Sequence, residues 1–339
     1  MRKVKTRKSI KKEDYEDLIY YKLKSNRFKQ QRLPAWRPIP TLWSIIIFYF
    51  FFGIIFITLG IIILIFSGKI ISQEIPYNEE CKNEDNQDPN NKNVCIMNVT
   101  IKENMKAPIM IYYKLNGFYQ NHRRYIRSKS QNQLYGKSSD TGDCDPIYTN
   151  KDMGFEEGRE SAEKKEDGTE PNPLDLNSSA IPCGLMAKTF FNDTFYDWNI
   201  IGGGSTITVN ESNIAFDKDK ELFKTVNLSK QWIDMKDEHF IVWMRPAGLP
   251  NFRKLWGRIN DGEIKKDDIL NFKINNTYNV DYYDGTKSII LTTNNKFGGK
   301  NGFMGVCFIV VGIISLVLGF AFPLLIYQRN KNESLKKNI

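Results

Sequence analysis

The sequence predicts a membrane protein in which two transmembrane helices flank a mainly β, disulfide-bonded ectodomain that also contains short helices. Three observations indicate this fold class: two long stretches lack any charged residue, the charges are distributed unevenly around them, and four of the five cysteines lie between them. Averages conceal the pattern, because 339 residues with a net charge of +9 and a mean hydropathy of −0.44 resemble a soluble, basic, nucleic-acid-binding protein.

Residues 1–41 form a basic tail with 13 Lys and Arg against 4 Asp and Glu. Pro34, Pro38 and Pro40 exclude a continuous helix from this tail into the membrane. Trp36 and Trp43 suit the lipid headgroup region. We therefore expect a flexible tail over residues 1–25, and contact with the membrane interface or a partner over residues 28–40.

The first uncharged stretch, residues 42–67, is expected to span the membrane. It has 26 residues, of which 19 are Leu, Ile or Phe, whereas crossing the hydrocarbon core takes about 20 helical residues. The long basic region before it and the length of the apolar run argue against a cleavable signal peptide. The stretch is therefore expected to act as an uncleaved signal anchor.

Residues 303–327 are the second uncharged stretch, and a second basic tail follows at residues 328–339. The segment between the spans, residues 68–302, has 31 basic and 34 acidic residues, so the positive charge is concentrated in the two tails. Basic segments beside spans stay in the cytosol. We therefore expect both termini to be cytosolic and the ectodomain to be lumenal or extracellular.

The second span has a stripe of glycines at seven-residue spacing, and neither span contains an ionisable group. Small residues on one stripe allow close approach of another helix, so a partner contact is expected at Gly305, Gly312 and Gly319. A transporter normally needs intramembrane ionisable residues, which argues against transport by this chain alone.

The cysteines of the ectodomain indicate an oxidising compartment, because their number is even and suits two disulfides. Three pairings are open, and the sequential one is the simplest. The absence of a CxxC motif, and the distance of both histidines from any cysteine pair in the sequence, argue against zinc. The four residues are Cys81, Cys95, Cys144 and Cys183.

The same segment is rich in acceptor triplets for N-linked glycans, which indicates a glycoprotein. A further triplet, at Asn332, lies in the C-terminal tail and is expected to stay unmodified. The six ectodomain acceptors are Asn98, Asn177, Asn192, Asn210, Asn227 and Asn275.

Short runs of β-branched and aromatic residues predict strands at 108–113, 239–244, 277–283 and 287–292. Apolar residues at helical spacing predict helices over 115–126 and 249–259. Residues 151–176 are charged and lack apolar periodicity, so an exposed loop is expected there.

No pattern indicates an enzyme. The glycine clusters at 202–204 and 298–300 lack the spacing of a phosphate-binding loop. The acidic run at 217–221 lacks the glycine and the terminal glutamate of a calcium loop. On the noncytosolic side of a membrane, His122, Arg123 and Arg124 are expected to meet carboxylates or a partner surface and not nucleic acid.

Seven segments carry a resemblance to a known family. In chain order they are FKQQRLPAW (28–36), NGFYQNHRRY (116–125), PCGL (182–185), FND (191–193), VWMRPAGLPNFRKL (242–255), GTKS (285–288) and GGKN (298–301). Together they resemble the cell-division-cycle-50 family, the accessory β-subunits of type IV P-type ATPases that flip phospholipids. Pro246, Gly248 and Gly302 depart from the usual family pattern, which bears on the choice of ATPase but not on topology.

The resemblance implies an antiparallel β-sandwich ectodomain with two disulfides and a noncatalytic role. It also implies a heterodimer with the catalytic ATPase subunit among membrane lipids, escort of that subunit from the endoplasmic reticulum to the Golgi or plasma membrane, and no cofactor apart from N-linked glycans. The partner contacts that it implies outside the glycine stripe are Pro34, Ala35, Trp36, Arg123, Arg124, Arg245, Phe252 and Arg253.

Two other classes share some of these features. A subunit of a two-span ligand-gated channel would have the same topology and a disulfide-bonded ectodomain, but four ectodomain cysteines are few for that class. A membrane-anchored lumenal enzyme would need a catalytic constellation that the sequence does not display.

Overall fold

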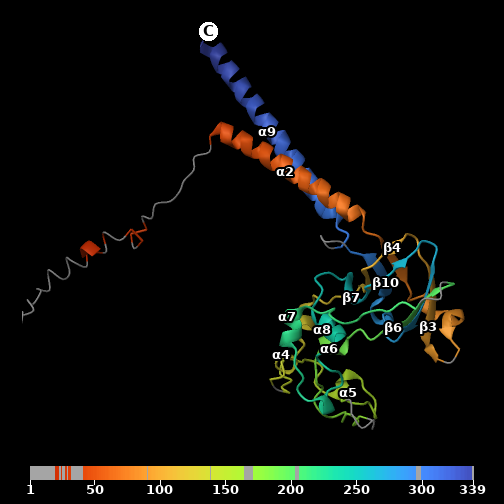
Figure 1. The fold of residues 1–339 in the computed structure, drawn as a ribbon. Coiled ribbons are helices and arrows are strands. Elements are labelled where there is room, and N and C mark those ends of the chain that lie inside the picture. The colour runs from red at the N-terminus through yellow and green to blue at the C-terminus, as the bar shows by residue number, and fades with distance from the viewer. Residues whose placement is uncertain are drawn as a thin grey trace, which may run out of the picture. The chain divides into compact units, whose positions relative to one another are not determined.

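The computed structural model describes residues 20–22, 24, 27, 28, 30, 31, 41–89, 91–137, 139–163, 171–202, 206–294 and 299–337. It divides into two compact units (Figure 1), one of Met1–Thr58 with Phe308–Ile339 and the other of Leu59–Cys307. All strands among the described residues belong to the second unit.

The two uncharged stretches form long helices, α2 (Leu42–Gly68) and α9 (Gly302–Lys337). Both are long and apolar enough to cross a membrane, and the chain is a two-span membrane protein. Helix α9 includes Pro323 and continues ten residues beyond the expected end at Tyr327. The helix therefore extends into the polar C-terminal segment, which composition alone assigned to a tail.

The ectodomain has two four-stranded antiparallel sheets and a two-stranded ribbon. Sheet A has the order β1-β10-β5-β7 and sheet B the order β2-β3-β9-β6. The strands of sheet A are β1 (Ser72–Pro76), β10 (Thr286–Thr293), β5 (Ile109–Asn116) and β7 (Phe252–Ile259). Those of sheet B are β2 (Gln87–Asp88), β3 (Asn91–Thr100), β9 (Ile269–Asn275) and β6 (Thr194–Ile201), and the ribbon joins β4 (Met105–Lys106) to β8 (Glu263–Ile264).

Aromatic side chains connect the two sheets. Trp256 of sheet A meets Phe195 of sheet B edge to face, with ring centroids 4.9 Å apart. Tyr113 of sheet A stacks on Phe191, just before β6, with centroids 4.0 Å apart. One buried core therefore lies between the sheets, as expected for a β-sandwich.

Short helices lie in the connections between strands. The α-helices are α3 (Arg123–Arg127), α4 (Gln131–Leu134), α5 (Asn150–Met153), α6 (Leu185–Lys188), α7 (Asp217–Leu222) and α8 (Glu238–Met244). The 3₁₀ turns are η1 (Glu80–Lys82), η2 (Glu84–Asn86), η3 (Leu228–Lys230) and η4 (Asp281–Tyr283).

Two predicted strands are wrong. Residues 239–244 lie in α8, because the Asp237 carboxylate accepts hydrogen bonds from the backbone N–H groups of His239 and Phe240 and caps a helix there. Residues 277–283 form no strand, because the N–H groups of Thr277 and Tyr278 bond to the Asp193 carboxylate in place of a neighbouring strand.

The two predicted helices are wrong over most of their length. Residues 252–259 form β7, in which an extra residue between Leu255 and Gly257 shifts the register with β5. This bulge buries Trp256, Gly257 and Ile259 on closely spaced positions, which imitates helical periodicity. In the other segment, Leu115 belongs to β5 and only Arg123–Arg127 is helical.

Candidate partner-binding surface

A buried polar cluster fixes the ectodomain. The Asp193 carboxylate accepts hydrogen bonds from the Lys287 ammonium and the Tyr77 hydroxyl, each at 2.7 Å. It also accepts from the backbone N–H groups of Thr277 and Tyr278 at 2.7 and 2.6 Å. Asp193 is 0% exposed and Lys287 is 2% exposed, so the hydrogen bonds of this carboxylate are shielded from water. The cluster ties the FND and GTKS segments together through the Asp193–Lys287 pair.

Burial changes the ionisation of this cluster. It lowers the pKa of Lys287 and raises the pKa of Tyr77 well above its usual value, and the nearby Asp193 charge raises that of Tyr77 further. An ammonium that also donates to the Tyr278 carbonyl has all its hydrogen bonds inside the protein. These features are typical of a structural ion pair and not of an acid-base catalyst.

The two longest motif segments form one surface. Phe118 N–H donates to the Pro250 carbonyl at 3.1 Å, and Asn121 Nδ2 donates to the Gly248 carbonyl at 2.9 Å. The buried Gln120 accepts from Ala247 N–H at 2.9 Å. Segments 117–121 and 247–251, distant in sequence, therefore hold each other rigidly while exposing Tyr119 (62%) and Leu249 (70%).

Lys254 stabilises the segment that carries Arg245. Its ammonium is buried and donates to the carbonyls of Val242, Trp243 and Arg245 at 3.0, 2.6 and 2.8 Å, at the C-terminus of α8. Burial lowers the pKa of Lys254 well below its usual value. A cation at this end of a helix satisfies carbonyls that have no partner within the helix.

Three of the predicted partner contacts lie around this segment. The Arg245 guanidinium lies 3.9 Å from the centroid of the Phe216 ring and 3.3 Å from Asp219. Arg253, on the next strand, lies 5.1 Å from the Tyr112 ring centroid. Phe252 is partly buried and packs against Phe118 of the 117–121 segment, with ring centroids 6.4 Å apart.

Arg123 and Arg124 occupy the exposed first turn of α3, directly after the 117–121 segment. Neither forms a salt bridge within the described residues. Arginines and exposed aromatic side chains on a rigid support are typical of protein interfaces.

The glycine stripe needs a correction. An added Cβ at Gly312 would lie 2.6 Å from Ile57 Cγ1 and 2.9 Å from the Gly53 carbonyl. Gly305 packs against Leu64, and Gly319 against Phe50, in the same way. The stripe thus faces the first span of the same chain, so it serves association of α2 with α9 and is not an open partner contact. Pro34, Ala35 and Trp36 lie outside the described residues.

The disulfides join Cys81 to Cys95 and Cys144 to Cys183, which is the sequential pairing. Cys307 is a free thiol in α9. Of the six glycan acceptors, five are exposed and Asn275 is partly buried. Their occupancy remains a prediction.

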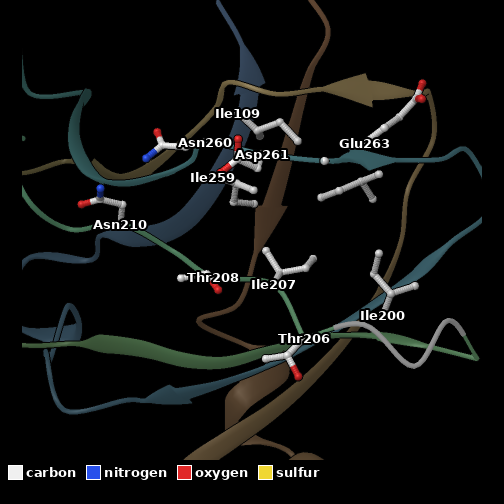
Figure 2. Close-up of a pocket in the computed structure, with 12 residues that line it drawn as sticks. Ile109, Ile200, Thr206, Ile207, Thr208, Asn210, Ile259, Asn260, Asp261 and Glu263 are labelled. Carbon is white, nitrogen blue, oxygen red and sulfur yellow. The ribbon is translucent and has the colours of Figure 1, made fainter.

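A separate hollow of about 430 Å³ lies between the 206–210 segment and the 259–264 turn. Figure 2 shows isoleucines at its centre, among them Ile207 and Ile259, with Asp261 and Glu263 toward one side. Its lining includes no Lys, Arg, His or Cys, and the described residues contain no cluster of metal-binding side chains.

Three further residues have structural roles that the sequence pattern did not single out: Gln120 and Lys254 support the surface, and Lys287 belongs to the buried Asp193 cluster. Each lies in a motif segment, and a lysine within an otherwise apolar, β-prone run such as Lys287-Ser288-Ile289-Ile290 is a signal for a buried, paired cation.

Comparison with known proteins supports the resemblance. The profile of the LEM3 (ligand-effect modulator 3) family / CDC50 family matches residues 63–332. The chain belongs to this family. It is 33% identical over 332 residues to ALA-interacting subunit 3 of Arabidopsis thaliana, covering 89% of this chain and 85% of the relative.

Animal relatives show similar values. Cell cycle control protein 50A of Bos taurus is 33% identical over 357 residues, covering 91% of this chain and 89% of the relative. Cell cycle control protein 50C of Macaca fascicularis is 29% identical over 350 residues, covering 91% and 95%. Membership of the LEM3/CDC50 family therefore extends over nearly the whole chain.

Proposed function

We propose that this chain is the noncatalytic β-subunit of a type IV P-type ATPase that translocates phospholipids. The observation that carries the proposal is the convergence of the two longest family motifs on one rigid, exposed surface, fixed by hydrogen bonds between segments 117–121 and 247–251. A relative that is named an interacting subunit supports the same role.

In this role the chain forms a heterodimer with the catalytic subunit. Arg123, Arg124, Arg245 and Arg253 contact the noncytosolic part of the ATPase, and the segment with Trp36 contacts its cytosolic face. The chain supports folding of the ATPase, its exit from the endoplasmic reticulum and its lipid-flipping cycle. Both termini are cytosolic, which follows from the basic tails.

The test is purification of the tagged full-length chain from membranes in mild detergent, followed by mass spectrometry of the intact complex. We expect a large P-type ATPase in about equal amount. An abundant, folded chain without any such ATPase would contradict the proposal. Ligand-gated conductance of the reconstituted chain alone would instead support a channel subunit.

A further inference from the structure

Each sheet has one face toward the shared core and one face away from it, the open face. The open faces of sheets A and B differ in their predicted glycan acceptors. In β3, Asn98 is exposed while Met97 is buried. Asn98 pairs with Asn271 of β9 in the strand register. Asn275 lies on the same face as Asn271, because side chains alternate along a strand and Phe272 and Ile274 are buried on the other face. Asn192 is exposed two residues before Thr194, the β6 partner of Asn275. Three acceptors therefore belong to the open face of sheet B.

Sheet A has no acceptor in any of its four strands. Asn177 and Asn227 lie in connections, and Asn210 pairs with Arg258 at the edge of β7. The open face of sheet A from β1 across to Arg253 and Leu255 is therefore free of predicted glycans.

Two hollows on this open face share Arg253. One, of about 510 Å³, is lined by Glu74, Lys114, Arg253 and Lys300, among others. The other, of about 390 Å³, is lined by Tyr112, Arg253 and Arg245 together with apolar side chains of α8. The strand register places Glu74, Ile290, Tyr112 and Leu255 in one row across the sheet, and Lys114 opposite Arg253 in the next row.

The charge of this face is positive. Lys114 pairs with Glu74 at 2.8 Å and Arg245 with Asp219 at 3.3 Å. Arg253 and Lys300 form no salt bridge within the described residues. Among the described residues, these two cations have no carboxylate partner, and they line hollows that also include Ile290, Tyr112 and Leu255.

We propose that the open face of sheet A, from Glu74 to Arg245, binds an acidic, extended segment of the partner ATPase on its noncytosolic side, while the open face of sheet B carries the N-linked glycans. This inference rests on the proposed function. Carboxylates of the partner segment pair with Arg253 and Lys300, and its apolar side chains enter the two hollows.

Introduced glycans test the assignment, because a glycan prevents close approach of a protein. Glu74→Asn with Pro76→Thr creates an acceptor triplet on exposed positions of β1, and Arg253→Asn with Leu255→Thr creates one between the hollows. Lys273→Thr is the matched control, because it creates a triplet at Asn271 on the open face of sheet B. Endoglycosidase shifts verify that each site is occupied.

We expect each sheet A variant to reduce the co-purified ATPase by about tenfold, whereas Lys273→Thr leaves it unchanged. Arg253→Glu, which adds no glycan, should weaken association more than Lys273→Glu, and far-ultraviolet circular dichroism checks that all variants fold.

Undiminished ATPase with a glycosylated sheet A variant overturns the proposal. Retained ATPase together with loss of bound lipid in native mass spectra would assign the face to lipid and also overturn it. Failure of the wild-type chain to capture any ATPase would contradict the proposed function itself.

Discussion

Replacement of Asp193 by alanine should destabilise the ectodomain more than any change at an exposed carboxylate. The substitution removes the acceptor of four hydrogen bonds and leaves the Lys287 ammonium, at 2% exposure, without its counter-charge. Removing one partner of a buried ion pair costs about 3–5 kcal/mol of the free energy of unfolding. The orphaned backbone donors of Thr277 and Tyr278 place this variant at the upper end of that range.

The magnitude can be measured as a shift of the thermal unfolding midpoint. For a domain of this size each kcal/mol corresponds to roughly 2–4 °C, so Asp193→Ala should lower the midpoint by roughly 10–20 °C. Intrinsic fluorescence of the full-length chain in detergent reports the transition, and Glu103→Ala, at an exposed position, is the matched control. Both variants must retain the disulfides.

A second variant separates loss of the charge pair from loss of the hydrogen bonds. In Lys287→Met, the Asp193 carboxylate keeps three of its four donors, so we expect a smaller destabilisation than in Asp193→Ala. Asp193→Asn combined with Lys287→Met should be less destabilising than the sum of the two single changes, because residues in one network couple. A midpoint shift for Asp193→Ala no larger than that of Glu103→Ala would refute the assigned role of the cluster.

Four further outcomes are expected. Burial raises the pKa of Tyr77 and Tyr113, so above pH 10 the unfolded chain binds fewer protons than the folded one. The free energy of unfolding should therefore fall by about 1.4 kcal/mol per pH unit for each tyrosine until the folded pKa is reached. Unfolding midpoints between pH 9 and 11 measure this. Gly312→Leu should separate α2 from α9 and broaden the size-exclusion peak in detergent, since even a Cβ would lie 2.6 Å from a side-chain carbon of the facing helix. Cys144→Ser opens a ring with a sequence separation of 39 and removes about 4 kcal/mol by loop entropy, so the protein should stay in the endoplasmic reticulum; normal delivery, observed by glycan trimming, would contradict this. Trp36→Ala should lower the amount of co-purified ATPase without changing the unfolding midpoint of the ectodomain.

The membrane spans and the disulfide-bonded β ectodomain could be predicted because single, strong physical effects determine them. Uncharged stretches of 25 and 26 residues have few alternatives to membrane helices. Strand β10 could be predicted because Ile289 and Ile290 are β-branched, apolar residues with low exposure, which favour a strand. In these segments local preference and tertiary packing favour the same structure.

The segments that form the proposed partner-binding surface could be singled out by resemblance, but their structure could not be predicted. The spacing of Leu255, Trp256 and Ile259 is typical of a helix, and only the pairing with β5 and the bulge before Gly257 make this segment a strand. Likewise, the glycine stripe indicated a close helix contact correctly, but sequence spacing does not show which helix makes the contact. Contacts between residues far apart in sequence determine both outcomes.

Two of the four segments whose predicted secondary structure is wrong, α8 and β7, are adjacent. Arg245 and Arg253 of the proposed interface lie at the end of α8 and in β7. Lys254 links the two structures. Its burial in β7 is stabilised because its ammonium donates hydrogen bonds to three carbonyls at the end of α8. Without the helix, this buried cation would have no acceptors, and without Lys254 the carbonyls that precede Pro246 would lose their donor. Natural proteins tend to break local sequence rules where function requires a particular geometry. The pairing of α8 with β7 through Lys254 therefore fixes the positions of Arg245 and Arg253 on the face that we assign to the partner.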